Sequence, residues 1–148
     1  MDNKVNKNSG IGRLASVVHS SSILFEAASE VIGERGVAES FMVLVGDFDL
    51  YRVGRSPLSV NEAVKSLIAM QGFTERTARL RFERLLDLRL IEVKVDSADR
   101  RRRLVYLSDS GASALLKIND LFEERIRDFY EMISASSSKN LVDWPRGP

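Results

Sequence analysis

Apolar positions recur at helical spacing over the first part of the chain and again near its end. From Ile11 to about Arg35, and from Ser108 to about Ile133, apolar residues return every three or four positions, as in amphipathic helices. Gly36 follows the first stretch and predicts its end. A helix of this length is too long for one small domain to bury, so a partner chain is expected to cover part of both stripes. The alternative is that the two stripes pack together within one subunit.

The segment from Ser40 to about Tyr51 is mostly apolar, and its periodicity fits either a short buried helix or a strand. We predict a helix, because a lone strand here would have no neighbour to pair with. Gly and Pro residues predict a loop from Arg52 to Pro57. Ser59 and Glu62 then have the S-x-x-E spacing of a capping box, which predicts a further helix that ends near Gly72.

Thr74 is expected to cap the next helix, because its hydroxyl can accept a hydrogen bond from a free amide of the first turn. At about 100° per residue, one side of that helix carries the apolar residues Ala78, Phe82, Leu85 and Leu86. The other side carries Arg76, Thr77, Leu80, Glu83 and Arg84, with Arg79 and Arg81 on its flanks. Two helices joined by a short Gly-containing connection predict a helix-turn-helix.

Two strands are predicted after this helix, at Ile91–Val95 and around Leu104–Leu107, where side chains alternate with a period of two. They pair most simply as a hairpin. Its connection, Asp96 to Arg102, contains no Gly or Pro, so we expect a mobile loop rather than a tight turn. The fold class is therefore mainly α with a small β-hairpin.

Positive charge is concentrated in the helix and hairpin. From Glu75 to Arg103 the chain has ten Lys or Arg and six Asp or Glu, whereas the net charge of the whole chain is +1. Guanidinium groups on a helix and a hairpin tip can neutralise phosphates, and a helix fits a major groove. The alternative for Arg100 to Arg103 is a solvated charge run in an exposed loop.

A motif in the hairpin resembles the wing signature of the MarR family of winged helix-turn-helix regulators, D-x-R-x-x-x-V-x-L-T/S-x-x-G. The matching positions are Asp99, Arg101, Val105, Leu107, Ser108 and Gly111. The resemblance covers roughly Leu58 to Gly111 by motif, and the flanking segments by length and pattern. It implies a winged helix-turn-helix flanked by N- and C-terminal dimerisation helices.

The resemblance also implies a function: a homodimer that binds double-stranded DNA at an operator and regulates transcription, with repression expected. The helix from Thr74 would lie in the major groove, and Arg101 would reach the minor groove or a phosphate with Asp99 orienting it. The candidate DNA-binding residues are Thr74, Arg76, Thr77, Arg79, Leu80, Arg81, Arg84, Asp99, Arg100, Arg101 and Arg102.

This sequence departs from the family pattern at three places. Members usually carry Gly at the position of Arg89, where the end of a helix favours a left-handed residue. They also tend to have an apolar residue at Arg81 and a basic one at Leu80. Leu80 is therefore expected either to contact a thymine methyl group or to pack inward.

The predicted organisation is a single domain over 11–133, between a flexible N-terminus at 1–10 and a flexible tail at 134–148. Within that domain, 11–51 and 108–133 supply the dimerisation helices and 57–107 forms the winged-helix lobe. The N-terminus lacks the apolar core of a signal peptide and no apolar run approaches membrane-spanning length, which predicts a cytoplasmic protein that does not contact membranes.

An enzyme is not expected. The chain has no cysteine, which excludes disulfides, thiolate nucleophiles and cysteine-ligated zinc. Its single histidine, His19, lies on a predicted helix, no pair of carboxylates stands out, and there is no Gly-rich phosphate loop. We therefore predict no catalytic residues, no cofactor and no metal.

Two further hypotheses remain open. A winged helix can also serve as a protein-interaction or replication-assembly module without sequence-specific operator binding. The long basic hairpin loop favours DNA over this alternative. The family resemblance also implies control by a small, often aromatic acid bound between the dimerisation helices and the DNA-reading lobe; Tyr51, Arg52 and His19 are candidate contacts.

Overall fold

The structure is a computed structural model that describes residues 7–52 and 57–135. Its elements are, in chain order, α1 (Lys7–Ile32), α2 (Arg35–Arg52), α3 (Val60–Gln71), α4 (Glu75–Asp87), β1 (Ile91–Val95), β2 (Arg103–Leu107) and α5 (Asp109–Ala135). The fold is mainly helical with one two-stranded antiparallel hairpin, as the sequence predicted.

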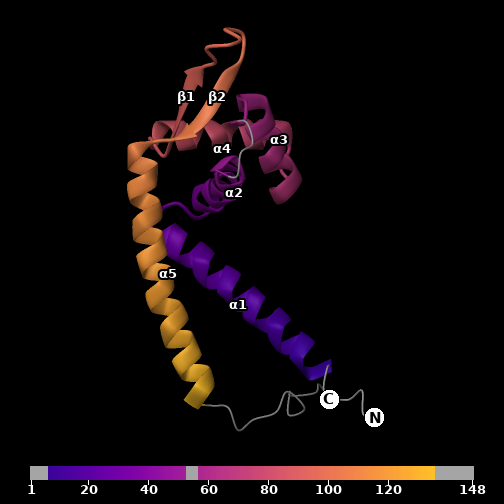
Figure 1. Ribbon diagram of the computed structural model, residues 1–148, viewed down its shortest axis with the longest axis vertical. Helices are drawn as coiled ribbons and strands as arrows, with labels where there is room; N and C mark the ends of the chain where they lie inside the picture. Colours follow the sequence, from indigo (N-terminus) through magenta and orange to yellow (C-terminus); the bar gives the residue numbers. More distant parts are fainter. Residues whose placement is uncertain (1–6, 53–56, 136–148) are drawn as a thin grey trace.

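The elements form a lobe with two long helices extending from it. Figure 1 shows α1 and α5 meeting beneath the lobe and diverging away from it, while the β1–β2 hairpin projects from the opposite end. Helices α2, α3 and α4 lie between, and α2 contacts α1, α3 and α4. The hairpin and the free ends of the long helices are therefore at opposite ends of the molecule.

A single apolar core joins the lobe to the long helices. Small residues at the crossing of α1 and α2, including Ala27, Ala28 and Ala38, are fully buried and allow the two helices to approach closely. Phe41 and Leu44 of α2 pack in the same cluster. The other buried apolar members include Ala63, Leu67, Ala78, Phe82, Leu85, Ile91, Val105 and Ile118. The core thus contains the apolar side predicted for α4.

The boundary between the first two helices differs from the prediction. Gly33, with a φ of 87°, follows the end of α1. Only glycine adopts this left-handed backbone conformation at little energetic cost. Gly36 was expected to end the helix but lies in the first turn of α2, which begins at Arg35. The helix preferred over a strand for residues 40–51 is confirmed.

The helix-turn-helix begins and ends at the predicted caps. Ser59 and Glu62 form a complete capping box at the start of α3: the Ser59 N–H donates to the Glu62 carboxylate at 2.7 Å, and the Glu62 N–H donates to the Ser59 hydroxyl at 3.2 Å. Gly72, with a φ of 67°, ends α3. The Thr74 hydroxyl accepts from the Thr77 N–H and caps α4.

The hairpin pairs in register from Ile91 opposite Leu107 to Val95 opposite Arg103. Its connection, which the sequence predicted to be a mobile loop, contains hydrogen bonds that form a turn. The Asp96 side chain accepts from the Ala98 N–H, and the Asp96 N–H donates to the Arg102 carbonyl at 2.9 Å. Aspartate side chains thus supply the turn geometry that Gly or Pro usually provides.

The junction between α4, β2 and α5 explains the end of the wing motif. Ser108 donates its hydroxyl to the Arg89 carbonyl and accepts from the Gly111 N–H, so it caps α5. A Cβ on Gly111 would lie 1.9 Å from the Leu90 carbonyl oxygen. Only glycine therefore allows the first turn of α5 to pack this closely against the strand entrance.

Three predicted segments fall wholly or partly outside the description. The structure does not describe residues 1–6, most of the 52–57 loop, or the tail beyond 135. Residues 7–10, expected to be flexible, form the first turn of α1. No helix in the described part of the chain is long and apolar enough to cross a membrane.

Candidate nucleic-acid interface

The N-terminal half of α4 presents an exposed polar surface. Thr74, Arg76 and Leu80 are exposed and Thr77 is half-buried, with the Thr74 hydroxyl donating to that of Thr77 at 3.0 Å. Leu80 is 56% exposed, so it does not pack inward. The outward alternative, in which Leu80 is free to meet an apolar group of a ligand, is the one the fold allows.

Arg79 lies where α4 meets the hairpin. Its guanidinium donates to Glu75 at 2.9 Å in an exposed pair one helical turn apart. Such pairs contribute little to stability, so Arg79 can exchange Glu75 for another anion at small cost. Arg79 and Arg103 of β2 also line one shallow groove of about 240 Å³, which places the helix and the hairpin side by side.

Arg81 is turned toward the protein rather than outward. Its guanidinium lies over the Phe73 ring, 5.9 Å from the centroid, and close against Gly36 at the start of α2. The sequence grouped Arg81 with the DNA-binding candidates from its place on the flank of the helix. A long side chain on the flank of a helix can point toward solvent or toward the protein. The Arg81 side chain points toward the protein and occupies the space above Gly36.

Arg84 is also engaged within the chain. It forms a two-pronged ion pair with Glu34, in the connection between α1 and α2, with Nε 3.1 and 3.2 Å from the two carboxylate oxygens. This hydrogen bonding lowers the pKa of Glu34 and raises that of Arg84. Helical angle alone assigned Arg84 to the open side, because it gave no indication of a carboxylate 50 positions earlier in the chain.

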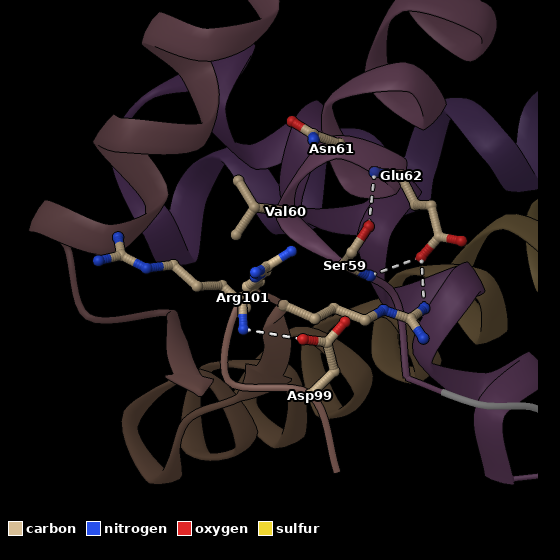
Figure 2. A pocket seen from close by; sticks show the side chains of 8 residues that line it. Ser59, Val60, Asn61, Glu62, Asp99 and Arg101 are labelled. Atoms are coloured by element: carbon tan, nitrogen blue, oxygen red, sulfur yellow. Dashed lines mark hydrogen bonds and ion pairs between the residues drawn. The ribbon is translucent and has the colours of Figure 1, made fainter. Parts of the chain in front are cut away.

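Asp99 shapes the tip of the β1–β2 hairpin, here called the wing, by accepting hydrogen bonds from backbone N–H groups. Its carboxylate accepts from the Arg101 N–H at 3.0 Å, and its carbonyl accepts from the Arg102 N–H at 2.9 Å. Figure 2 shows the Asp99 side chain turned toward that Arg101 nitrogen. Asp99 was expected to orient Arg101; the bond observed is to the backbone of Arg101 and not to its guanidinium.

Arg102 ties the wing to the start of α3. Its guanidinium donates to Glu62 at 3.2 Å. The same carboxylate oxygen accepts from the Ser59 N–H, and Figure 2 shows Glu62 turned toward Ser59. The Ser59 hydrogen bonds and then Arg102 lower the pKa of Glu62. An open cavity of about 480 Å³ lies between the wing and this helix start, lined also by Asp99 and Arg101.

Three of the candidate arginines remain available for an external anion. Arg76 on α4 and Arg100 and Arg101 at the wing tip are exposed, and none forms an ion pair with another described residue. Two sites of free positive charge thus lie on α4 and on the hairpin tip. Residues 34 and 62, which hold Arg84 and Arg102, were not predicted as partners; the capping pattern indicated Glu62 only as a cap.

The remaining candidates for chemistry are few. His19 packs against Phe129 of α5 with ring centroids 5.0 Å apart, which gives it a role in joining the long helices. The side chains of Tyr51 and Arg52 lie outside the described residues. Within the described part of the chain, no three His, Cys, Asp or Glu side chains gather in a group that could hold a metal ion.

An open hollow of about 450 Å³ lies where α1, α2 and the end of α3 meet. It is lined by Phe25, Glu39, Val43, Met70, Gln71 and Phe73. This hollow lies between a long helix and the helix-turn-helix, in the region where an effector crevice was expected.

A helix-turn-helix followed by a basic hairpin, between two long helices, defines a winged helix-turn-helix protein. Comparison with solved structures gives the same fold. MepR of S. aureus, solved as a DNA complex, aligns with a TM-score of 0.57 and 21% identity over 88% of each chain. MarR of E. coli aligns with a TM-score of 0.53 and 19% identity over 89% of this chain and 87% of that one.

Rv1404 of Mycobacterium tuberculosis aligns with a TM-score of 0.55 and 18% identity, over 96% of this chain and 89% of that chain. No protein-family model and no curated protein matches the sequence. The fold is therefore MarR-like, and this similarity extends over nearly the whole chain, including the two long helices.

Proposed function

We propose that this protein is a sequence-specific double-stranded DNA-binding transcriptional regulator that acts as a homodimer. The observation that carries the proposal is the pairing of an exposed helix face with a basic wing. Arg76 and Leu80 on α4 face outward, and Arg100 and Arg101 occupy the tip of the adjoining hairpin. The DNA complex of MepR, which has a similar fold, supports the same use of this architecture.

Each part has a distinct role. Helix α4 enters the major groove, where Thr74, Thr77 and Arg76 reach phosphates or base edges and Leu80 contacts a thymine methyl group. The wing lies over the adjacent minor groove or its phosphates through Arg100 and Arg101, since guanidinium groups are attracted to narrow minor grooves. Arg79 joins this set when it leaves Glu75.

Some candidates act by holding this surface in place. Asp99 fixes the turn that carries Arg101, and Arg102 anchors the wing to Glu62. Arg81 and Arg84 are engaged with the helix connections and are left out of the proposed contact set. The proposed DNA contacts therefore involve only some of the basic residues in α4 and the wing.

Homodimerisation is supported by apolar side chains exposed on the long helices. These are Val17 and Val18 on α1, and Leu116, Tyr130, Met132 and Ile133 on α5. Large apolar groups exposed on two neighbouring elements are compatible with a subunit interface. Repression is the proposed mode of regulation, because occupying an operator suffices for it.

A small aromatic acid is the proposed effector, and its proposed binding site is near the hollow between α1 and α3. A thermal-shift screen of carboxylated aromatics would test whether such a compound stabilises the protein.

The experiment is a fluorescence-anisotropy titration of duplex DNA at several salt concentrations. Binding is expected, with log K falling linearly against log salt because counterions are released from phosphates. Arg101→Ala should lower the salt slope by about one and weaken all duplexes to a similar extent. Arg127→Ala, which removes the same charge from an exposed site on α5, serves as the control and should leave the slope unchanged.

Failure to bind any duplex even at low salt would contradict the proposal and favour a protein-interaction module. An unchanged slope for Arg101→Ala, with binding intact in the wild type, would instead remove only the assigned phosphate contact.

A further inference from the structure

Glu34 joins α4, the helix proposed to enter the major groove, to the connection between α1 and α2. This residue lies between Gly33 and Arg35, and its carboxylate receives Arg84 of α4 on both oxygens. Arg84 and Glu34 are 46% and 39% exposed, so the pair is accessible rather than buried. A bidentate contact fixes orientation as well as distance, because both oxygens and two guanidinium nitrogens are engaged.

A second arginine of α4 reaches the same connection. The Arg81 guanidinium lies over Gly36, where a Cβ would be 2.6 Å from its terminal nitrogen, and it adds to the positive charge around Glu34. The glycine in the first turn of α2 leaves the room that Arg81 occupies. A cation near a helix N-terminus is unfavourable, and the Glu34 carboxylate offsets this.

The free arginines and the engaged arginines therefore divide along α4. Arg76, near the N-terminus of the helix, forms no ion pair with a described residue, and Arg79 pairs only within α4. Arg81 and Arg84, in the C-terminal half, instead reach the first turn of α2 and the α1–α2 connection. α1 continues directly into this connection. The contact thus links one of the two long helices to the helix proposed to read DNA.

We propose that Glu34 is a positioning residue that holds α4 at the angle required for DNA reading through its bidentate ion pair with Arg84. Arg81 packs next to this pair, over Gly36. This inference rests on the proposed function. Through this contact the end of α1 constrains the orientation of α4, because a bidentate Arg–carboxylate pair fixes direction as well as distance.

The opposite role for the same pair would be competition. If Arg84 were a phosphate contact that Glu34 holds back, loss of the carboxylate would release a cation toward DNA. The two roles predict opposite signs: positioning predicts weaker specific binding when Glu34 is neutralised, whereas competition predicts tighter binding and a steeper salt dependence.

The test is Glu34→Gln in the full chain, measured by anisotropy on a duplex selected by the wild type and on a scrambled duplex. Glu30→Gln, four positions earlier in the chain, is the matched control, because it removes the same charge from an exposed pair with Arg125. Relative to that control, the specific duplex should bind roughly two- to fivefold more weakly, with the scrambled duplex and the salt slope unchanged. Thermal unfolding of both variants verifies that each is folded.

A double-mutant cycle completes the test. Arg84→Gln alone should cause a similar loss of specificity at an unchanged salt slope, and the Glu34→Gln, Arg84→Gln double variant should be no worse than either single variant. Equal behaviour of Glu34→Gln and Glu30→Gln would overturn the inference. So would tighter binding with a slope steeper by about one, which would assign Arg84 to a phosphate. A wild type that binds no duplex would show instead that the proposed function itself has failed.

Discussion

Arg89 carries a local strain that the sequence pattern already indicated. Among the described residues it is the only non-glycine with a positive φ, at 56°. A non-glycine residue in the left-handed region has unfavourable contacts between its Cβ and the backbone. The conformation is held because the Leu90 N–H and the Ser108 hydroxyl bond the chain on either side of the turn.

Arg89→Gly should therefore stabilise the fold. The relief of strain outweighs the extra freedom of glycine in the unfolded chain, for a net gain of about 0.5–1 kcal/mol in the free energy of unfolding. Chemical denaturation measures this. Arg100→Gly, the same change where φ is not positive, should give no gain. A loss of stability for Arg89→Gly would mean that the arginine side chain has a stabilising role that outweighs the strain.

The sequence did not predict the direction in which the long arginine side chains of α4 point. Helical angle correctly separated the buried Ala78, Phe82 and Leu85 from the exposed side of α4. It could not tell that Arg81 and Arg84 bend toward α2, because their partners lie on other elements. Periodicity constrains where a Cα lies, whereas the far end of an arginine is decided by tertiary neighbours.

At the scale of elements, local signals predicted the boundaries well wherever a cap defined them. Ser59, Thr74 and Gly72 mark the ends of α3 and α4 through side-chain and left-handed caps that are written in the sequence. The first boundary was less well predicted. Gly33 and Gly36 stand three positions apart, and only packing decides which of them ends a helix.

One carboxylate, that of Glu62, contributes to the attachment of the wing to the start of α3. Glu62 accepts from Ser59 and from Arg102, and these bonds lower its pKa below the usual value of 4.5. A carboxylate with a lowered folded pKa stabilises the fold above its unfolded pKa and loses that contribution as pH falls through the folded value. The wing contact is therefore expected to weaken on the acid side.

Glu62→Gln tests this dependence. The variant should be less stable than the wild type at about pH 7, and the difference should shrink as the pH falls below about 4. Denaturant unfolding across that range measures it. Glu83→Gln, at an exposed carboxylate that forms no ion pair with a described residue, should show no such convergence. A wild-type and Glu62→Gln difference that stays constant with pH would contradict the assignment.

At the scale of the molecule, the lobe and the long helices have separate roles that the hydrophobic pattern only partly revealed. The pattern predicted both long helices, and the structure shows α1 and α5 in contact, with His19 against Phe129 and a Ser16–Tyr130 hydroxyl pair at 3.2 Å. Even so, apolar residues remain exposed on both. Packing within one subunit therefore accounts for part of each stripe, and the exposed remainder is the surface that the proposed dimer would cover.

Replacing Val17 and Val18 together with Glu should convert a dimer into a monomer. Both side chains are more than 60% exposed, so the change does not disturb the core of one subunit. Sedimentation velocity measures the mass. Met70→Glu, an equally exposed apolar position on α3, should leave the dimer intact. A wild type that sediments as a monomer, or a double variant that remains a dimer, would rule out this interface.

The central claim is that α4 and the wing of two copies read duplex DNA together. Selection of bound duplexes from a random pool by the wild-type protein tests it most directly. An inverted repeat whose half-sites lie about one helical turn apart should be enriched. Recovery of no common motif, or of a single unrepeated site, would contradict it.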